Sequence, residues 1–186
     1  MSSEMHGVAF EAFNKIPRLN RHVVITEKID GTNAQVYIGA DGTIIAGSRN
    51  RWLTPESDNF GFARWVHDNA DKLRTLGEGR HFGEWWGAGI QRRYGLDHKR
   101  FSLFNVGRWT EEQAAAAGCF LVPVLYQGID LHGGLAEALT TLRAAGSVAS
   151  PGFHEPEGVV VYHSAGRNLY KVTLEGDEQP KGMAAP

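Results

Sequence analysis

A charged, turn-prone block lies between two apolar, β-branched stretches near the start of the chain. Residues 23–39 read VVITEKIDGTNAQVYIG, with Lys28 and Asp30 in the middle. A lysine amine attacks an electrophile only when it is neutral, and an ordinary lysine pKa of about 10.4 leaves almost none of it neutral at pH 7. Apolar burial or neighbouring cations lower that pKa, so Lys28 is a candidate nucleophile. The alternative is a surface lysine beside a simple Asp-Gly turn.

The block KIDGTN resembles the Lys-x-Asp-Gly signature of the covalent nucleotidyltransferases, which comprise ATP-dependent DNA and RNA ligases and mRNA capping enzymes. Asn33 is similar to the RNA ligase residue, because DNA ligases and capping enzymes usually carry arginine at that position. The chain then matches five further motifs in the family's order: SR at 48–49, HFGEWWG at 81–87, FSLFNV at 101–106, EGVV at 157–160 and LYKVT at 169–173. Chance is a poor explanation for this order.

The resemblance implies a lysine that becomes covalently adenylylated. Lys28 would attack the α-phosphate of ATP and hold AMP through a phosphoramide bond. Negative charge builds on the phosphate oxygens in such a reaction, so cations must lie close by. Arg49 would bind phosphate through its planar fork of donors, and Lys171 would supply a point charge that could also lower the pKa of Lys28. Asn33 would contact the transferring phosphate.

The resemblance also implies residues that hold the nucleoside. Glu84 would accept hydrogen bonds from the ribose hydroxyls, and Phe104 would stack on adenine. Glu27 and Ile29, on either side of the lysine, would flank the base, and Val160 completes the predicted nucleotide-binding set. Each of these residues, taken singly, also fits an ordinary structural role. The order of the motifs favours the nucleotide-binding interpretation.

Glu157 is the candidate metal ligand, because Mg²⁺ or Mn²⁺ accepts hard oxygen ligands such as a carboxylate. The chain departs from the family pattern at two positions. The final motif usually carries two lysines separated by one residue, but here the first position is Leu169 and Lys171 alone remains, with Arg167 as a possible substitute. The lysine that often follows the hydrophobic motif is replaced by Tyr162.

These residues need a scaffold of strands. Alternating and β-branched stretches predict strands at residues 22–26, 33–39, 44–48, 81–87, 101–106, 119–126, 158–163 and 168–174. Helical spacing predicts helices at 58–76 and 134–145, and Thr110 with Gln113 predicts the capping box of a short helix. The pattern predicts an α+β fold with mixed, mostly antiparallel sheets and flanking helices. The resemblance implies the ligase-type, ATP-grasp-like nucleotidyltransferase domain.

Composition excludes several classes of protein. The chain has 186 residues, 42% of them hydrophobic, and a net charge of −2, so nucleic-acid binding would need a local basic patch. Basic stretches with aromatics at 48–52 and 91–100 could grip RNA, and solvated loops are the equal alternative. Cys119 is the single cysteine, which excludes an internal disulfide. Without a signal peptide or a long apolar run, we expect a cytoplasmic protein with no membrane partner.

We expect residues 1–174 to form the adenylation domain and residues 175–186 a disordered tail, with no appended OB-fold or helical domain. The leading hypothesis is an ATP-dependent RNA ligase that uses ATP and Mg²⁺ or Mn²⁺ to activate a 5′-phosphate end and seal it to a 3′-hydroxyl. RNA with such ends is the expected partner; DNA, an RNA:DNA hybrid and a partner protein supplying the missing accessory domain stay open. The alternatives are a DNA ligase, a guanylyltransferase-like domain, and a non-catalytic nucleotide- or RNA-binding module, which the loss of a lysine at Leu169 favours.

Overall fold

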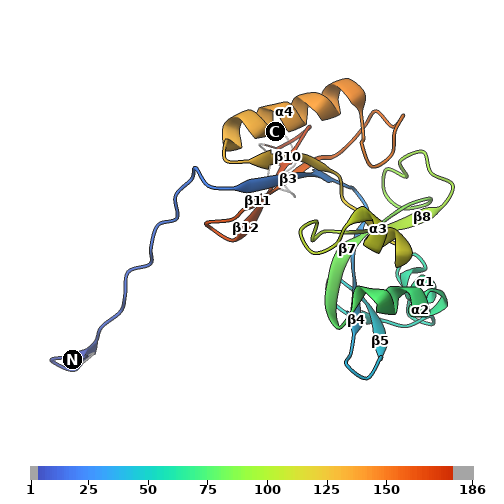
Figure 1. The fold of residues 1–186 in the computed structure, drawn as a ribbon, viewed down its shortest axis with the longest axis horizontal. Coiled ribbons are helices and arrows are strands. Elements are labelled where there is room, and N and C mark those ends of the chain that lie inside the picture. The colour runs from blue at the N-terminus through green and yellow to red at the C-terminus, as the bar shows by residue number, and fades with distance from the viewer. Residues whose placement is uncertain (1–3, 178–186) are drawn as a thin grey trace, which may run out of the picture.

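The computed structural model describes residues 4–177, which form two lobes, each built on its own β-sheet (Figure 1). The chain passes from one lobe to the other between β3 and β4, and returns between β9 and β10. The two sheets therefore meet at these crossings. The predicted tail at 175–186 lies mostly outside the described residues.

The first lobe contains a four-stranded sheet in the order β10-β3-β11-β12, with every neighbouring pair antiparallel. Its strands are β3 (Val23–Lys28), β10 (Val124–Gly128), β11 (Gly158–His163) and β12 (Asn168–Thr173). Helix α4 (Leu131–Ala145) lies along one face and buries Ala138 and Leu142 in a cluster with Ile25. Side chains alternate along a strand, so every second residue of β3 is directed to the other face.

The second lobe contains a six-stranded sheet in the order β6-β5-β4-β7-β8-β9, in which β8 and β9 alone are parallel. Its strands are β4 (Thr32–Ile38), β5 (Ile44–Ser48), β6 (Trp52–Leu53), β7 (Gly79–Gly87), β8 (Lys99–Leu103) and β9 (Phe120–Leu121). One face is covered by α1 (Phe62–Asp68), α2 (Ala70–Leu73), the 3₁₀ helix η1 (Arg74–Leu76) and α3 (Glu111–Ala116). The core lies between this face and the helices. The other face, called the open face below, carries no helix of residues 4–177; near the crossing the β7–β8 loop covers it, where Tyr94 packs on Trp86.

A short hairpin of β1 (Glu4–Met5) and β2 (Val8–Ala9) lies at the end of an extended segment that runs away from both lobes (Figure 1). Residues 6–21 are exposed. The segment is fixed to the first lobe at its base, because the His163 ring bonds to the Leu19 carbonyl at 2.7 Å. Within residues 4–177, no helix is long and apolar enough to cross a bilayer.

The predicted α+β class with mostly antiparallel sheets is confirmed, and the capping box of Thr110 and Gln113 is present at α3. The single helix predicted at 58–76 is wrong. The helix begins at Phe62, and Asp58 caps it from outside by accepting a backbone N–H of the first turn at 2.7 Å. Asn69 then breaks it, because the φ of this residue is −112° and its amide bonds back to an α1 carbonyl at 2.8 Å.

Most other predicted elements differ from the observed ones by one to three residues at an end, and three of the differences have a clear local cause or consequence. The strand predicted at 119–126 is split into β9 and β10 at Pro123, which has no N–H to donate to a ladder. The strand predicted at 101–106 ends at Leu103, so Phe104 lies just beyond β8. The helix predicted at 134–145 begins at Leu131, because the Asp130 carboxylate accepts a backbone N–H of the first turn at 2.9 Å.

Candidate active site

Lys28 is the last residue of β3, and its side chain points to the sheet face opposite α4. Burial alternates along β3, with Thr26 and Lys28 half-buried and their neighbours fully buried. Val160 on β11 is the direct partner of both Thr26 and Lys171, so these side chains share one face with Lys28. Lys171 lies two strands away from β3, about 10 Å across the sheet. Three of the predicted nucleotide-binding residues therefore come from one sheet face.

Lys28 forms an ion pair with Glu157, in which Nζ donates to Oε2 at 2.5 Å. The two side chains are 22% and 12% exposed, so the pair is largely shielded from water. Gly158, the residue after Glu157, pairs with Lys28 in the sheet at a φ of 151°, and a Cβ there would collide with the Val172 carbonyl, so this position requires glycine. The direct partner of the candidate nucleophile is thus a carboxylate, where the sequence had led us to expect cations.

Glu84 comes from the open face of the second sheet and is directed to the crossing between the lobes. Its carboxylate accepts the Gly31 backbone N–H at 3.0 Å and the Asn33 amide at 3.2 Å. A Cβ on Gly31 would lie 2.5 Å from the Trp85 carbonyl, so this position requires glycine. Burial raises the pKa of Glu84 to about 7, partly offset by the Gly31 hydrogen bond and the nearby positive charge of Lys28.

Phe104 lies at the end of β8 on the same open face as Glu84. Its backbone N–H donates to the Phe82 carbonyl at 3.0 Å, which continues the β7–β8 pairing by one residue. The Phe104 and Phe82 side chains are 41% and 52% exposed. Phe104 is therefore an exposed ring beside Phe82, two residues beyond Ser102, the strand partner of Glu84, and it is not part of the buried core.

Arg49 lies in the exposed turn between β5 and β6. It follows Ser48, which pairs with Ala34 on β4. Because the two strands are antiparallel, Arg49 continues toward Asn33, the residue before Ala34. Within residues 4–177, Arg49 forms no ion pair. Its predicted phosphate contact stays a prediction.

The side chains of Glu27 and Ile29 do not face this site. The Glu27 carboxylate is 1% exposed and accepts the Ser147 hydroxyl at 2.5 Å and two backbone N–H groups, of Val148 and Ala149, at 2.8 Å each. Burial raises the pKa of Glu27, and these hydrogen bonds oppose the shift. Ile29 is 4% exposed in an apolar cluster. Neither side chain is open to a base, although the backbone between them lines the crossing.

The loop between β7 and β8 contains residues that the sequence led us to assign to RNA or to solvent. Arg92 Nε bonds to the Asp30 carboxylate at 3.0 Å, and its NH1 bonds to the Glu155 carbonyl at 3.0 Å. The Tyr94 ring is 1% exposed, and its hydroxyl accepts the Asp30 backbone N–H at 2.8 Å. Both residues therefore hold the backbone beside Lys28. The sequence held one signal of this structural role, because Tyr94 lies in a loop that is bounded by glycines.

The acidic groups can provide part of a metal site. Within the described residues, no group of three or more His, Cys, Asp or Glu side chains is arranged to hold a metal ion. Mg²⁺ is commonly bound through one or two carboxylates, with substrate phosphates and water as the other ligands. Glu157 and Glu84 are close enough for the charge of one to raise the pKa of the other. This donor set fits a cation whose remaining ligands come from a nucleotide.

Comparison with protein families gives one match that covers most of the chain. The family model described as RNA ligase matches residues 21–173. The match includes the ion pair of Lys28 and Glu157, Glu84 and the Arg92 loop. No curated protein sequence matches the chain.

Solved structures of the RNA ligase of Naegleria gruberi share the fold. A variant with ATP and Mn has a TM-score of 0.61 and 20% identity, over 84% of this chain and 51% of that one. A variant with AMP and Mn has a TM-score of 0.58 and 22% identity, over 83% and 50%. The form with pyrophosphate has a TM-score of 0.58 and 20% identity, over 83% and 50%. The chain thus spans about half the length of these ligases.

Proposed function

The chain belongs to the RNA ligase family, and from this premise we propose that it is an ATP-dependent RNA ligase whose Lys28 carries AMP. The observation that supports this most directly is the placement of Lys28 between the sheets, bonded to Glu157 and close enough to Glu84 to lower its pKa. The Naegleria gruberi ligases of the same fold were solved with ATP, AMP or pyrophosphate, which are a substrate and the two released products of ATP-dependent ligation.

In the first step, Lys28 Nζ attacks the α-phosphorus of ATP. A P–N bond forms, the bond between the α-phosphorus and the bridging oxygen breaks, and pyrophosphate leaves. The amine must give up a proton, and the Glu157 carboxylate is its direct hydrogen-bond partner in position to accept it. We assign Lys171 and Arg49 to the phosphate charge, and Glu84 to the ribose hydroxyls.

In the second step, a 5′-phosphate oxygen of RNA attacks the AMP phosphorus, and the P–N bond breaks to return the lysine amine. In the third step, an RNA 3′-hydroxyl attacks the activated 5′-phosphorus, which forms the phosphodiester and releases AMP. Glu157 would hold a divalent cation through the oxygen that does not bond to Lys28, or through both oxygens once that bond is broken. Such a cation, when bound, would neutralise charge on the phosphate oxygens.

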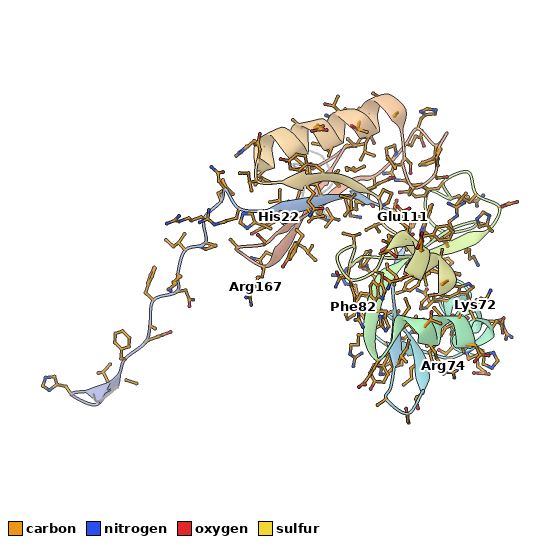
Figure 2. All side chains as sticks on the ribbon, in the orientation of Figure 1. His22, Lys72, Arg74, Phe82, Glu111 and Arg167 are labelled. Carbon is orange, nitrogen blue, oxygen red and sulfur yellow. The ribbon has the colours of Figure 1, made fainter. Side chains whose placement is uncertain are left out.

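Labelled nucleotide tests the first step. Protein incubated with Mg²⁺ and ATP labelled at the α-phosphate is expected to retain label through denaturing electrophoresis. Lys28→Ala should abolish the adduct, because among residues 4–177 Lys28 is the lysine whose amine bonds to Glu157. Lys72→Ala is the matched control, since Lys72 is exposed on α2, at the helix-covered side of the second sheet (Figure 2). Label that persists in Lys28→Ala would refute the assignment.

Further arms of the same assay separate the alternatives. Labelled GTP in place of ATP distinguishes a guanylyltransferase-like domain, and nicked RNA, nicked DNA and single-stranded RNA identify the strand that is joined. Absence of any adduct in the wild type would favour the non-catalytic binding module. The cytoplasmic location, the domain at 1–174 and a partner protein with an accessory domain stay predictions.

A further inference from the structure

The open face of the second sheet carries a row of side chains that continues away from Glu84. On β7 the residues on this face are Arg80, Phe82 and Glu84, because they alternate with residues directed to the helices. Figure 2 shows Phe82 on the side of this lobe opposite the α2 region, where Lys72 is labelled. The row begins at the predicted nucleotide site and ends at Arg80, about 13 Å along the strand.

Arg80 lies against two neighbouring aromatic rings. Its guanidinium carbon is 5.3 Å from the centre of the Tyr37 ring and 5.1 Å from that of the Trp52 ring, and NH1 donates to the Gln35 side chain at 3.0 Å. The rings of Tyr37 and Trp52 are 6.3 Å apart. Glycine at position 47 makes room for the indole, since a Cβ there would lie 3.0 Å from it. The contacts hold the rings in place without covering them.

These rings remain accessible. Trp52 is 45% exposed and Phe82 is 52% exposed, beside the 41% exposed Phe104. The rings are interleaved with an arginine and the polar side chain of Gln35, so this face combines flat apolar surfaces with a positive charge and hydrogen-bonding groups. Flat rings next to a fixed positive charge are what single-stranded nucleic acids require, because bases stack on the rings and the cation lies near phosphates.

We propose that Trp52, Arg80 and Phe82 form a stacking platform for unpaired bases of the RNA strand, continuous with the nucleotide site at Glu84. This inference rests on the proposed function and extends it by naming the surface that holds the strand. The platform recognises stacked bases and their phosphates without reading sequence, because every base presents a flat face. The strand thus enters the site along β7, over the open face.

RNA binding and adenylyl transfer to Lys28 are measured separately. The probe is a dye-labelled, single-stranded RNA with a 5′-phosphate, and its anisotropy gives the dissociation constant. Trp52→Leu and Arg80→Ala are each expected to weaken binding about 5- to 150-fold, the range that loss of one stacked base implies. Trp52→Phe keeps a flat ring and should bind within a few-fold of the wild type. Labelling with ATP alone should be unchanged in all three variants.

The controls are groups of the same chemistry outside the platform. Arg108→Ala removes a guanidinium that lies 4.7 Å from the Trp109 ring, which packs against the helix-side core. Tyr170→Ala removes a ring that is 55% exposed on β12, on the face opposite Lys171. Both are expected to bind RNA like the wild type. Equal binding by Trp52→Leu, Arg80→Ala and these controls would overturn the proposal.

A measurement on the wild type avoids dependence on folded variants. RNA carrying 5-iodouridine is irradiated with the protein, and the crosslinked peptide is identified by mass spectrometry. A crosslink to Trp52, Tyr37 or Phe82 supports the platform, and crosslinks confined to other surfaces refute it. Failure of the proposed function would instead appear as a wild type that takes no label from ATP, whatever its RNA binding.

Discussion

At the scale of single residues, Glu84 carries the clearest physical signature of the site. It is 7% exposed, and its carboxylate is held by the Gly31 N–H in the β3–β4 crossing and by the Asn33 amide on the neighbouring strand β4. Burial disfavours its charged form, and the carboxylates of Glu157 and Asp30 add to that effect. A buried carboxyl whose pKa is raised to about 7 and that lies beside other charged groups is typical of a functional site.

The raised pKa of Glu84 gives a prediction on stability. Between about pH 4.5, the ordinary value, and about pH 7, the folded protein keeps a proton that the unfolded chain has released. The free energy of unfolding therefore falls as pH rises through this window, by up to about 3 kcal/mol. Glu84→Gln cannot titrate, so its melting temperature relative to the wild type should be higher at pH 8 than at pH 5. Thermal unfolding of both proteins at the two pH values measures this, and parallel profiles would contradict it.

At the scale of elements, the loop between β7 and β8 supports the β3–β4 crossing. It holds three non-glycine residues at positive φ: Gln91 at 43°, Arg93 at 59° and Tyr94 at 51°. Such backbone is costly and persists where surrounding contacts enforce it, commonly near functional sites. The enforcing contacts here are those of Arg92 and Tyr94 with Asp30. The strained loop thus fixes the backbone two residues after Lys28.

Arg92→Ala is expected to slow self-adenylylation about tenfold or more, because a small displacement of Asp30 moves the nearby nucleophile out of line. Arg92 acts through Asp30 and the Glu155 carbonyl, so it is a positioning residue. Its loss should lower the rate constant more than it weakens ATP binding, and rapid-quench kinetics at several ATP concentrations separate the two. Arg93→Ala, the exposed neighbour in the same loop, serves as the control and should react at nearly the wild-type rate. An equal effect of both substitutions would contradict this role.

The sequence predicted elements well where the pattern is local. The strand predicted at 44–48 is β5 itself, and the Lys-x-Asp-Gly block does lie at the end of one strand and the start of the next. The prediction from sequence failed where contacts between residues far apart in the chain determine the structure. Nothing in the local pattern shows that Arg92 pairs with an acid 62 positions away, or that Glu27 binds a loop about 120 positions away. The helix at 58–76 failed because its apolar spacing is continuous while its backbone is broken at Asn69.

At the scale of the whole molecule, the site is built from residues of both lobes. Lys28, Val160 and Lys171 come from the first sheet, and Glu84 and Phe104 come from the second. The order of motifs along the sequence predicted this set, but not the fact that the chain alternates between two sheets to assemble it. Apart from the crossings, the lobes are joined near the site by Arg92 of the β7–β8 loop, which bonds to the Glu155 carbonyl next to the first sheet. A nucleotide bound between the sheets would therefore add contacts to both.

Binding of ATP should stabilise both lobes together. A ligand at about 100 times its dissociation constant adds about 2.7 kcal/mol to the free energy of unfolding, which corresponds to roughly 5–10 °C in a chain of this size. We expect this shift in Lys28→Ala, which can bind ATP without forming the adduct. Glu84→Ala should lose most of it, because the ribose hydroxyls lose their acceptor. Calorimetry with and without ATP and Mg²⁺ measures both variants.

Hydrogen exchange locates the stabilisation within the molecule. With ATP present, Lys28→Ala should gain protection in β11 and β12 of one lobe and in β4 and β7 of the other, because the nucleotide contacts both sheets. GTP is the matched control, since a site that reads adenine should show a smaller effect at the same concentration. Protection confined to one lobe would mean that the nucleotide binds on a single sheet. The assignment of Lys28 and Glu84 to one bound molecule would then be wrong.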